Sequence, residues 1–316
     1  MTKPRIVVVG SSNTDMIIKL DRIPQPGETI LGGEFTTAAG GKGANQAVAA
    51  ARAGGEITFV ARVGQDMFGE QAVAGFVKDH LRVQYVLRDP KAPSGVALIF
   101  VANDGENSIA VASGANGRLI PSDVKKAERA IAGANSVLMQ LETPLETVQA
   151  AARSAARAKV PVILNPAPAR KLPAELLRLV SILTPNETEA ELLTGIAVRN
   201  EESAARAAEA LLARGVKTVI ITLGARGAFL AEASTRQLVP GFKVKPVDTT
   251  AAGDVFNGAL AVALGERRPL IEAVRFANAA AAISVTRLGA QPSAPARSEI
   301  EKLLASTKSA CRRSWR

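Results

Sequence analysis

The chain has 316 residues, of which 47% are hydrophobic and 22% are charged, a composition typical of a globular protein with a sizeable core. No stretch approaches the ~20 uninterrupted apolar residues that span a bilayer, and the apolar run before Gly10 is too short for a secretory signal, so we expect no membrane partner. The single cysteine, Cys311, excludes an internal disulfide framework and fits a reducing compartment, for which the cytoplasm is the default.

The formal net charge of +10 raises the question of nucleic-acid binding. Part of this charge lies in residues 308–316, which include basic but no acidic side chains, whereas elsewhere the two signs are interspersed. A short basic end is typical of a frayed, solvated terminus. We therefore interpret the charge as one that attracts anionic nucleotides and sugar phosphates rather than as a nucleic-acid site.

Apolar runs alternate with helical patterns along the chain, which favours one α/β domain over residues 1–316 with a central, mostly parallel sheet flanked by helices. The runs are continuous rather than alternating, as expected of strands covered on both sides. In chain order, the expected strands are 6–9, 57–60, 137–141, 162–164, 182–184 and 216–223, and the expected helices are 44–53, 122–133, 145–158, 187–194 and 201–214.

Two segments, 15–38 and 95–112, break this rhythm, because each contains two strand-like runs separated by a turn sequence. We expect them to form hairpins outside the main sheet. A small β-sheet lid over the carboxyl edge of the parallel sheet is the economical arrangement, since ligands bind at that edge. A lid with exposed strand edges favours pairing with a second copy, so we expect a homodimer.

The stretch from Asp248 to Asp254 places small residues directly before a helical pattern. Backbone N–H groups at such a helix start form an anion site. A carboxylate at Asp254 would then be positioned to accept a proton from a hydroxyl that attacks phosphorus. An aspartate that caps the helix would explain the same pattern, and the pattern alone does not decide between the two.

A second glycine-rich stretch, residues 40–46, also opens a helix. It does not match the P-loop, because Lys42 is followed by glycine, and it does not match the dinucleotide fingerprint. Lys42 and Asn45 supply donors suited to sugar hydroxyls. A glycine hinge before a helix is the alternative explanation.

Polar residues follow several of the expected strands. Asn13 and Asp15 come after the first strand and could bind vicinal hydroxyls, and Glu142 follows a later one. Asn186 and Glu189 are one helical turn apart and could hold hydrated Mg²⁺ or cap a helix. These residues would meet at one edge of the sheet.

The glycines of the segment 222–227, which follows another strand, would allow close approach to a nucleotide. Together these patterns resemble the ribokinase-like carbohydrate kinases of the PfkB family. The resemblance covers Arg5 to Ser293 and is carried by four motifs in the same order, Gly-Gly-Lys-Gly-Ala-Asn-Gln (40–46), Asn-Pro-Ala-Pro-Ala-Arg (165–170), Thr-Pro-Asn-Glu-Thr-Glu-Ala-Glu (184–191) and Asp-Thr-Thr-Ala-Ala-Gly-Asp (248–254).

The resemblance implies a three-layer α/β fold with a β-sheet lid, and an enzyme that transfers phosphate from ATP to the 5-hydroxyl of D-ribose, giving D-ribose 5-phosphate and ADP. It implies that Asp254 is the catalytic base, beside an anion hole made by the N–H groups of Ala251, Ala252 and Gly253. The residues implied to hold the sugar are Asn13, Thr14, Asp15, Gly41, Lys42, Gly43, Ala44, Asn45, Glu142 and Asp254. Those implied to contact ATP are Asn186, Thr222, Leu223, Gly224, Ala225, Arg226, Gly227, Gly253 and Asn278.

Two metal ions are also implied by the resemblance. Mg²⁺ would be held through water by Asn186 and Glu189. The implied K⁺ ligands, several of them through backbone carbonyls, are Asp248, Thr250, Ser284, Arg287, Gly289 and Ser293. Many relatives have glycine where Ala251 stands, and the added methyl group matters only if this residue needs a positive φ.

Other functions stay open on the sequence. Within the family, deoxyribose, fructose and nucleosides are alternative substrates. From other classes, the chain could be a catalytically silent sugar sensor that keeps the fold. The presence of Asp254 and of the whole anion hole argues against it, and release of ADP would distinguish the two. A nucleic-acid-binding protein would have to bind after removal of residues 308–316.

Overall fold

One large sheet runs through the middle of the protein and organises the rest of the fold. The structure is a computed structural model that describes the backbone of residues 2–313 and the side chains of residues 2–306. In this part of the chain the sheet has nine strands in the order β13-β12-β11-β10-β9-β8-β1-β4-β5. They are β1 (Arg5–Val9), β4 (Glu56–Gly64), β5 (Arg82–Asp89), β8 (Ser136–Met139), β9 (Val162–Leu164), β10 (Ile182–Leu183), β11 (Thr218–Thr222), β12 (Gly227–Ala231) and β13 (Arg236–Pro240). All neighbours are parallel except the pairs β11–β12 and β12–β13.

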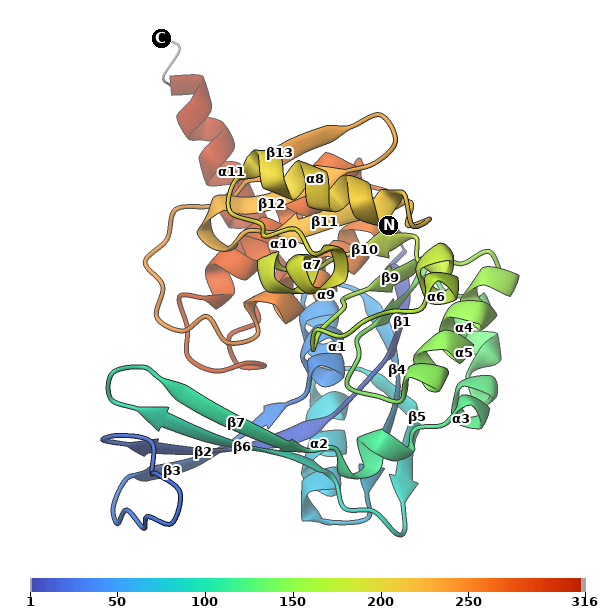
Figure 1. Cartoon of the computed structure of the whole chain (residues 1–316). Helices are drawn as coiled ribbons and strands as arrows, with labels where there is room; N and C mark the ends of the chain where they lie inside the picture. The colour runs from blue at the N-terminus through green and yellow to red at the C-terminus, as the bar shows by residue number, and fades with distance from the viewer. Residues whose placement is uncertain (1, 314–316) are drawn as a thin grey trace.

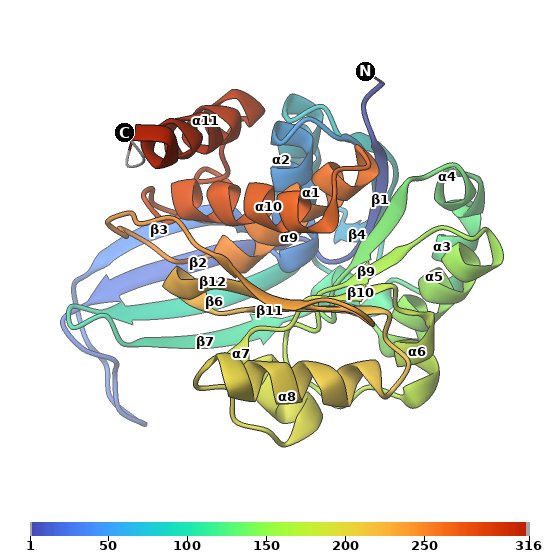
Figure 2. The ribbon, with the colours of Figure 1, turned by 90° about the horizontal axis from the view of Figure 1, so that it is seen from above.

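Helices cover both faces of this sheet (Figures 1 and 2). One layer consists of α1 (Lys42–Arg52), α2 (Met67–Lys78), α9 (Ala252–Gly265), α10 (Leu270–Ser284) and α11 (Arg297–Arg313). The other consists of α3 (Pro121–Lys126), α4 (Glu128–Ala132), α5 (Leu145–Arg157), α6 (Ala174–Leu179), α7 (Glu187–Thr194) and α8 (Glu201–Leu212). Along β1, Ile6 and Val8 enter the first core and Val7 and Val9 enter the second. A strand buried on both faces therefore reads as an unbroken apolar run.

A second sheet of four strands projects from the body and forms the lid (Figure 1). Its order is β3 (Glu34–Gly40), β2 (Asn13–Leu20), β6 (Gly95–Ala102), β7 (Asn107–Ala112), with two antiparallel hairpins joined by the parallel pair β2–β6.

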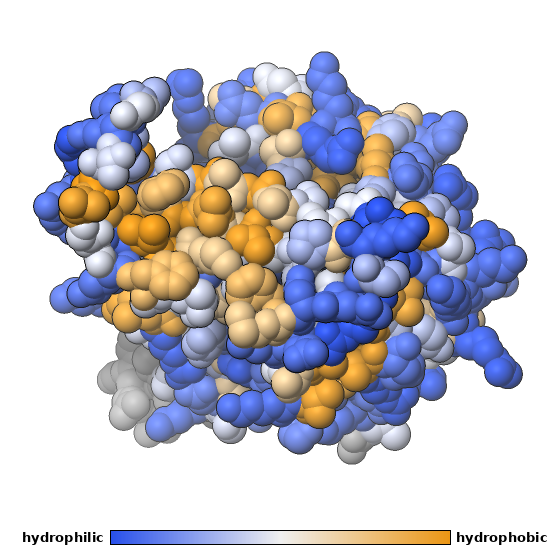
Figure 3. Space-filling model, turned by 90° about the horizontal axis from the view of Figure 1, so that it is seen from below, coloured by the Kyte–Doolittle hydropathy of each residue, from blue (hydrophilic) through white to orange (hydrophobic). Residues whose placement is uncertain are grey.

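Both faces of the lid sheet carry apolar side chains. By the strand register, exposed Phe35 and Leu98 share one face, while exposed Ile109 and Val111 share the other face with Asp15. Seen from below, hydrophobic residues gather over this sheet (Figure 3). The lid thus has one apolar face beside a carboxylate and another that points away from it.

The expected fold, a mostly parallel sheet between helical layers with a small β-sheet lid, is confirmed. The helix expected at 122–133 is divided at Ala127, whose N–H bonds to the carbonyl of Val124, three residues back, and tightens the turn. Strands β5, β12 and β13 are not among the expected elements. Of these, β5 and β13 lie at the sheet edges, where polar residues interrupt the apolar pattern that identifies a strand.

The backbone of residues 308–313 continues helix α11, whereas residues 314–316 of the expected basic tail lie outside the described residues. Among the residues that the structure describes, no helix combines the length and the apolar character that crossing a membrane requires.

Candidate active site

The loops that follow five parallel strands meet at the carboxyl edge of the large sheet. The first turn of helix α1 lies beside the first turn of helix α9, as the hydrogen bond from the Asn45 amide of α1 to the Asp254 carboxylate of α9 at 3.0 Å indicates. A cavity of about 180 Å³ opens here. The expected site residues that line it are Lys42, Asn186, Glu189, Thr222, Ala251, Ala252, Gly253 and Asp254.

Helix α9 begins with a strained residue. Ala251 has φ 58°, in the left-handed region, which for a non-glycine residue costs roughly 1–2 kcal/mol. Ala251 thus adopts a positive φ, the condition under which its methyl group was expected to matter. Of the three expected N–H donors, that of Ala252 already bonds to the carbonyl of Thr249 at 3.2 Å. The described residues offer no acceptor to the N–H groups of Ala251 and Gly253, so two donors remain for an anion in this conformation.

Asp254 is almost fully buried, with 6% of its surface exposed. Burial raises the pKa of its carboxyl, while the charge of Lys42 and the amides of Gln46 and Asn45 act in the opposite direction. Burial would lower the pKa of Lys42, but the surrounding carboxylates, Asp254 first among them, raise it above its usual value. The cavity thus holds a charged lysine beside a buried carboxyl that can accept a proton.

Several of the sugar-binding residues expected from the sequence lie close to Asp254, where the start of α1 packs against the turn after β1. Thr14 does not, because the strand register puts it on the face of β2 opposite Asp15. A Cβ on Gly41, which has φ 88°, would lie 2.7 Å from the backbone nitrogen of Asn13, and one on Gly43 would lie 2.4 Å from that of Ser11. Only glycine permits this contact. Glu142 then accepts hydrogen bonds from the Ser11 hydroxyl at 2.5 Å and from the N–H of Lys42 at 3.0 Å.

Asp15, on lid strand β2, lies on the face of the lid sheet that carries Ile109 and Val111 of β7, and its carboxylate fills the space that a Cβ on Gly40 would need. Burial, together with the negative charges of Glu142 and Asp254, raises the pKa of Asp15 to about 6. A lid carboxylate and a body carboxylate therefore face the same small volume.

A larger cavity of about 430 Å³ adjoins the first, and Thr222, Thr249, Ala252 and Gly253 line both. Its wall includes the expected residues Gly224, Ala225, Gly227 and Asn278 together with apolar Phe242, Val244, Pro246, Phe256 and Val285. Apolar walls with a few polar groups suit the base and ribose of a nucleotide. The two cavities meet at the start of α9.

Three residues expected to contact ATP have other contacts. Leu223 is buried in the core on the α8 side of the sheet. The Arg226 guanidinium pairs with Glu187 and donates to the carbonyl of Arg199, and Arg226 does not line the cavity. Asn278 lines the cavity, but its amide donates to the carbonyl of Val239 at 3.0 Å and so links α10 to β13.

Asn186 and Glu189 form a capping box at the start of α7: the Asn186 side chain accepts from the N–H of Glu189 at 2.8 Å, and Glu189 accepts from the N–H of Asn186 at 2.9 Å. The capping reading of the pattern is confirmed, and the capped pair also lines the cavity of Asp254. Within the described residues, no group of three His, Cys, Asp or Glu side chains could by itself hold a metal ion.

Asp248 joins two loops beside α9. Its carboxylate accepts from the N–H of Thr250 and from the N–H of Gly289, each at 2.8 Å, and these bonds help to lower its pKa although burial acts to raise it. Of the other residues implied to bind K⁺, Ser284 and Ser293 are buried, and the Arg287 side chain pairs with Glu299. The carbonyl-rich loops that the K⁺ assignment needs are therefore linked through Asp248.

Several polar residues that surround Asp254 were not among the expected site residues. Gln46, Asn165, Thr184 and Asn257 are all buried, and the last three line the cavity. Gln46 and Asn165 stand in motifs noted above. Their direction could not be read from sequence, because a buried amide shows no periodicity that distinguishes it from a packing residue.

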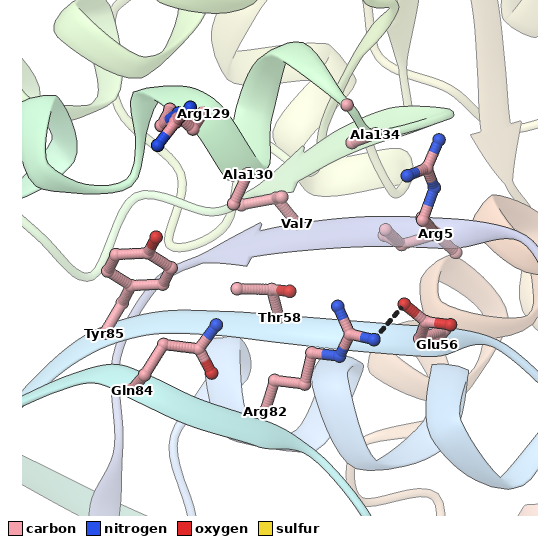
Figure 4. Close-up of a pocket in the computed structure, with 12 residues that line it drawn as sticks. Arg5, Val7, Glu56, Thr58, Arg82, Gln84, Tyr85, Arg129, Ala130 and Ala134 are labelled. Atoms are coloured by element: carbon pink, nitrogen blue, oxygen red, sulfur yellow. Dashed lines mark ion pairs between the residues drawn. The ribbon is translucent and has the colours of Figure 1, made fainter.

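Another hollow, of about 360 Å³, lies near the amino ends of β1 and β4, far along the strands from Asp254. It includes Arg5, Arg82 and Arg129, but Arg82 pairs with Glu56 at 2.7 Å, and the other two guanidinium groups point to opposite ends of the hollow (Figure 4). These charges do not converge on one ligand position.

Comparison with known proteins agrees with this geometry. Residues 3–297 match the family described as pfkB family carbohydrate kinase. The chain is 46% identical over 299 residues to the ribokinase of Haemophilus influenzae, covering 95% of this chain and 98% of that protein. The solved structure of ribokinase from Thermotoga maritima has a TM-score of 0.88 and 42% identity, covering 96% of this chain and 100% of that one.

Arabidopsis thaliana ribokinase, solved as a complex with ribose and ATP, has a TM-score of 0.89 and 36% identity, covering 96% of this chain and 99% of that one. The family match thus extends over nearly the whole chain, and these relatives are similar along their full lengths. The chain belongs to the pfkB family of carbohydrate kinases.

Proposed function

We propose that this protein is an ATP-dependent kinase that phosphorylates the 5-hydroxyl of D-ribose and releases ADP. The observation that carries the proposal is the position of the buried carboxyl of Asp254. It lies beside Asn45, Asp15 and Glu142, which we call the polar recess, and it lines the cavity that adjoins the larger, mostly apolar one. The full-length relatives named ribokinase support ribose as the sugar.

The recess has unused hydrogen-bonding capacity that suits a sugar. The Asn45 side-chain oxygen is buried without a partner among the described residues, although its nitrogen is bonded to Asp254. A buried acceptor without a donor is costly, and a sugar hydroxyl would satisfy it. Asp15 and Glu142 add two carboxylates that accept from vicinal hydroxyls.

In the reaction, the 5-hydroxyl oxygen attacks the γ-phosphorus of ATP while Asp254 takes the hydroxyl proton. The new O–P bond forms as the bond to the ADP oxygen breaks. The N–H groups of Ala251 and Gly253 at the positive end of α9, with Lys42, face the phosphoryl oxygens where charge builds up. Asn186 and Glu189 would hold Mg²⁺ through water, and the ion would offset phosphate charge.

The direct test is a panel of ribose, 2-deoxyribose, fructose and nucleosides with ATP and Mg²⁺, followed by release of ADP. Ribose should be the best substrate, and a chelator should abolish turnover.

Asp254→Asn should lower kcat by roughly 10²–10⁴-fold with little change in ribose affinity, because it removes the base and keeps the shape. Preference for another sugar, or near-full turnover of the variant, would reject the assignment.

Ribose binding should depend on pH through Asp15. Its carboxyl has a raised pKa of about 6, so it is ionised above that pH and protonated below it. A protonated carboxyl accepts fewer hydrogen bonds from sugar hydroxyls, so the ribose Kd should rise roughly tenfold between pH 7 and pH 5. Calorimetry can measure this. Asp15→Asn should bind ribose weakly but with a flat profile, and a slope unchanged in the variant would assign the titration to another group.

We also propose activation by K⁺ at the loops that Asp248 links. A large cation bound by carbonyls beside α9 would stabilise the loop that carries the N–H donors. At matched ionic strength and saturating Mg²⁺, K⁺ should raise kcat well above Na⁺, and Asp248→Ala should reduce that difference. Equal rates in K⁺, Na⁺ and a bulky organic cation would contradict the proposed K⁺ site.

Since ATP and K⁺ are cytoplasmic solutes, we propose that the protein is located in the cytoplasm, which cell fractionation can check.

We propose further that two copies pair through the lid face that carries Phe35 and Leu98, which points away from Asp15. Exposed apolar side chains on a four-stranded sheet favour such burial. Leu98→Lys should convert a dimer into a monomer in sedimentation, whereas Ile109→Lys, which is equally apolar and exposed but on the other face, should leave it a dimer. A wild-type monomer, or dissociation by Ile109→Lys alone, would refute the interface.

A further inference from the structure

Behind Asp254 lies a row of buried amide side chains from α1 and the ends of β8 and β9. Gln46, with no exposed surface, donates through Nε2 to Asp254 Oδ1 at 2.9 Å and to Asn165 Oδ1 at 3.0 Å. Its Oε1 accepts from Gln140 Nε2 at 2.5 Å. The Gln46 amide is therefore bonded at both ends and cannot rotate without breaking these bonds.

The direction of each amide in the row follows from groups that can only accept. An ionised carboxylate only accepts, so the nitrogen of Gln46 must face Asp254. The carbonyl of Thr184 also only accepts, so Asn165 turns its nitrogen to that carbonyl, at 3.0 Å, and its oxygen to Gln46. The orientation of Gln46 is thus determined from two sides.

The row continues to the first turn of the helix that carries Asp254. The Thr184 hydroxyl donates to Asn257 Oδ1 at 2.6 Å, and the Asn257 amide donates to the carbonyl of Gly253 at 2.8 Å. Asp254 is therefore connected through side chains of α1, β9 and β10 to the backbone next to it. A displacement of Gln46 would therefore change the position of both the Asp254 carboxylate and the start of α9.

We propose that Gln46 is a positioning residue for Asp254: its oriented amide holds one carboxylate oxygen while Asn45 holds the other, so that the carboxylate plane stays fixed toward the attacking hydroxyl. This inference rests on the proposed kinase function. It adds a residue that does not touch the sugar or the nucleotide but acts through the base.

The charge balance of the site supports this role. Burial raises the pKa of Asp254, and the hydrogen bond from Gln46 is one of the interactions that oppose the rise, after the charge of Lys42. Without that bond the carboxylate would be protonated over a wider pH range, and it would lose one of the two hydrogen bonds that fix its orientation. A base in the wrong protonation state or orientation lowers kcat rather than substrate affinity.

The test uses Gln46→Met, which keeps the length and removes the donor, and Gln46→Glu, which keeps the acceptor for Gln140 but places a carboxyl beside Asp254. Thr147→Val is the matched control, because it deletes another buried hydrogen bond, to the carbonyl of Leu119, that involves neither Asp254 nor a residue bonded to it. For each protein the pH dependence of kcat and of kcat/KM for ribose is measured together with the thermal midpoint.

Gln46→Met should lower kcat roughly 10- to 100-fold, the loss expected for a hydrogen bond to a charged group. The acidic limb of its profile should move to higher pH by about one unit, and further in Gln46→Glu because like charges repel. KM for ATP should change little. Thr147→Val should lower the thermal midpoint and leave the profile in place.

A Gln46→Met protein with a lowered thermal midpoint but the wild-type pH profile and kcat would overturn the proposal, because packing alone would then explain the residue. If the Gln46 variants do not fold, Gln140→Met decides, since it removes only the donor that orients Gln46. It should shift the acidic limb in the same direction by a smaller amount, and an unchanged profile would refute the idea. Failure of the wild-type protein to phosphorylate ribose would instead count against the proposed function.

Discussion

Much of the structure around the active site serves to stabilise a single buried carboxyl group, that of Asp254. Removing a carboxylate from water is strongly unfavourable unless charges and hydrogen bonds replace the lost hydration. Here Lys42, Asn45 and Gln46 supply them, all from the first turns of α1. The site exists only where α1 and α9 approach closely.

That approach depends on small residues at the helix contact. A Cβ on Gly258 of α9 would lie 2.6 Å from the carbonyl oxygen of Gln46 and 2.8 Å from the side chain of Ala49. Glycine at this position and alanine along α1 let the two helices pack at a distance that larger side chains would prevent. The alanine-rich character of α1 is thus part of how the carboxylate is held.

The lid addresses a different physical problem. Its inner face carries the carboxylate of Asp15, and burial, followed by the negative charges of Glu142 and Asp254, raises the pKa of that group. A ligand that donates hydrogen bonds relieves this repulsion, so binding and the electrostatic state of the lid are coupled. The outer face is apolar as well, which is unusual for a projecting sheet unless something covers it.

Much of the fold could be predicted because it is written in local patterns. The unbroken apolar run of β1 identifies a strand whose two faces are both covered by helices. The pair Asn186 and Glu189 predicts the capped start of α7 that the structure contains. Edge strands such as β5 gave no clear pattern, since most of their side chains are partly or fully exposed. For the site, the glycine-rich start of α1 and the small residues before Asp254 were recognisable because backbone geometry restricts which residues can stand there.

What sequence alone determined is therefore the set of elements and the chemistry of the helix starts. The tertiary structure decided which side chains share a volume. Gln46 and Asp254 are 208 positions apart, and only the packing of α1 on α9 turns the amide toward the carboxylate rather than into the core. The left-handed conformation of Ala251 and the turning away of Arg226 likewise arise from contacts between distant segments, which no local pattern encodes.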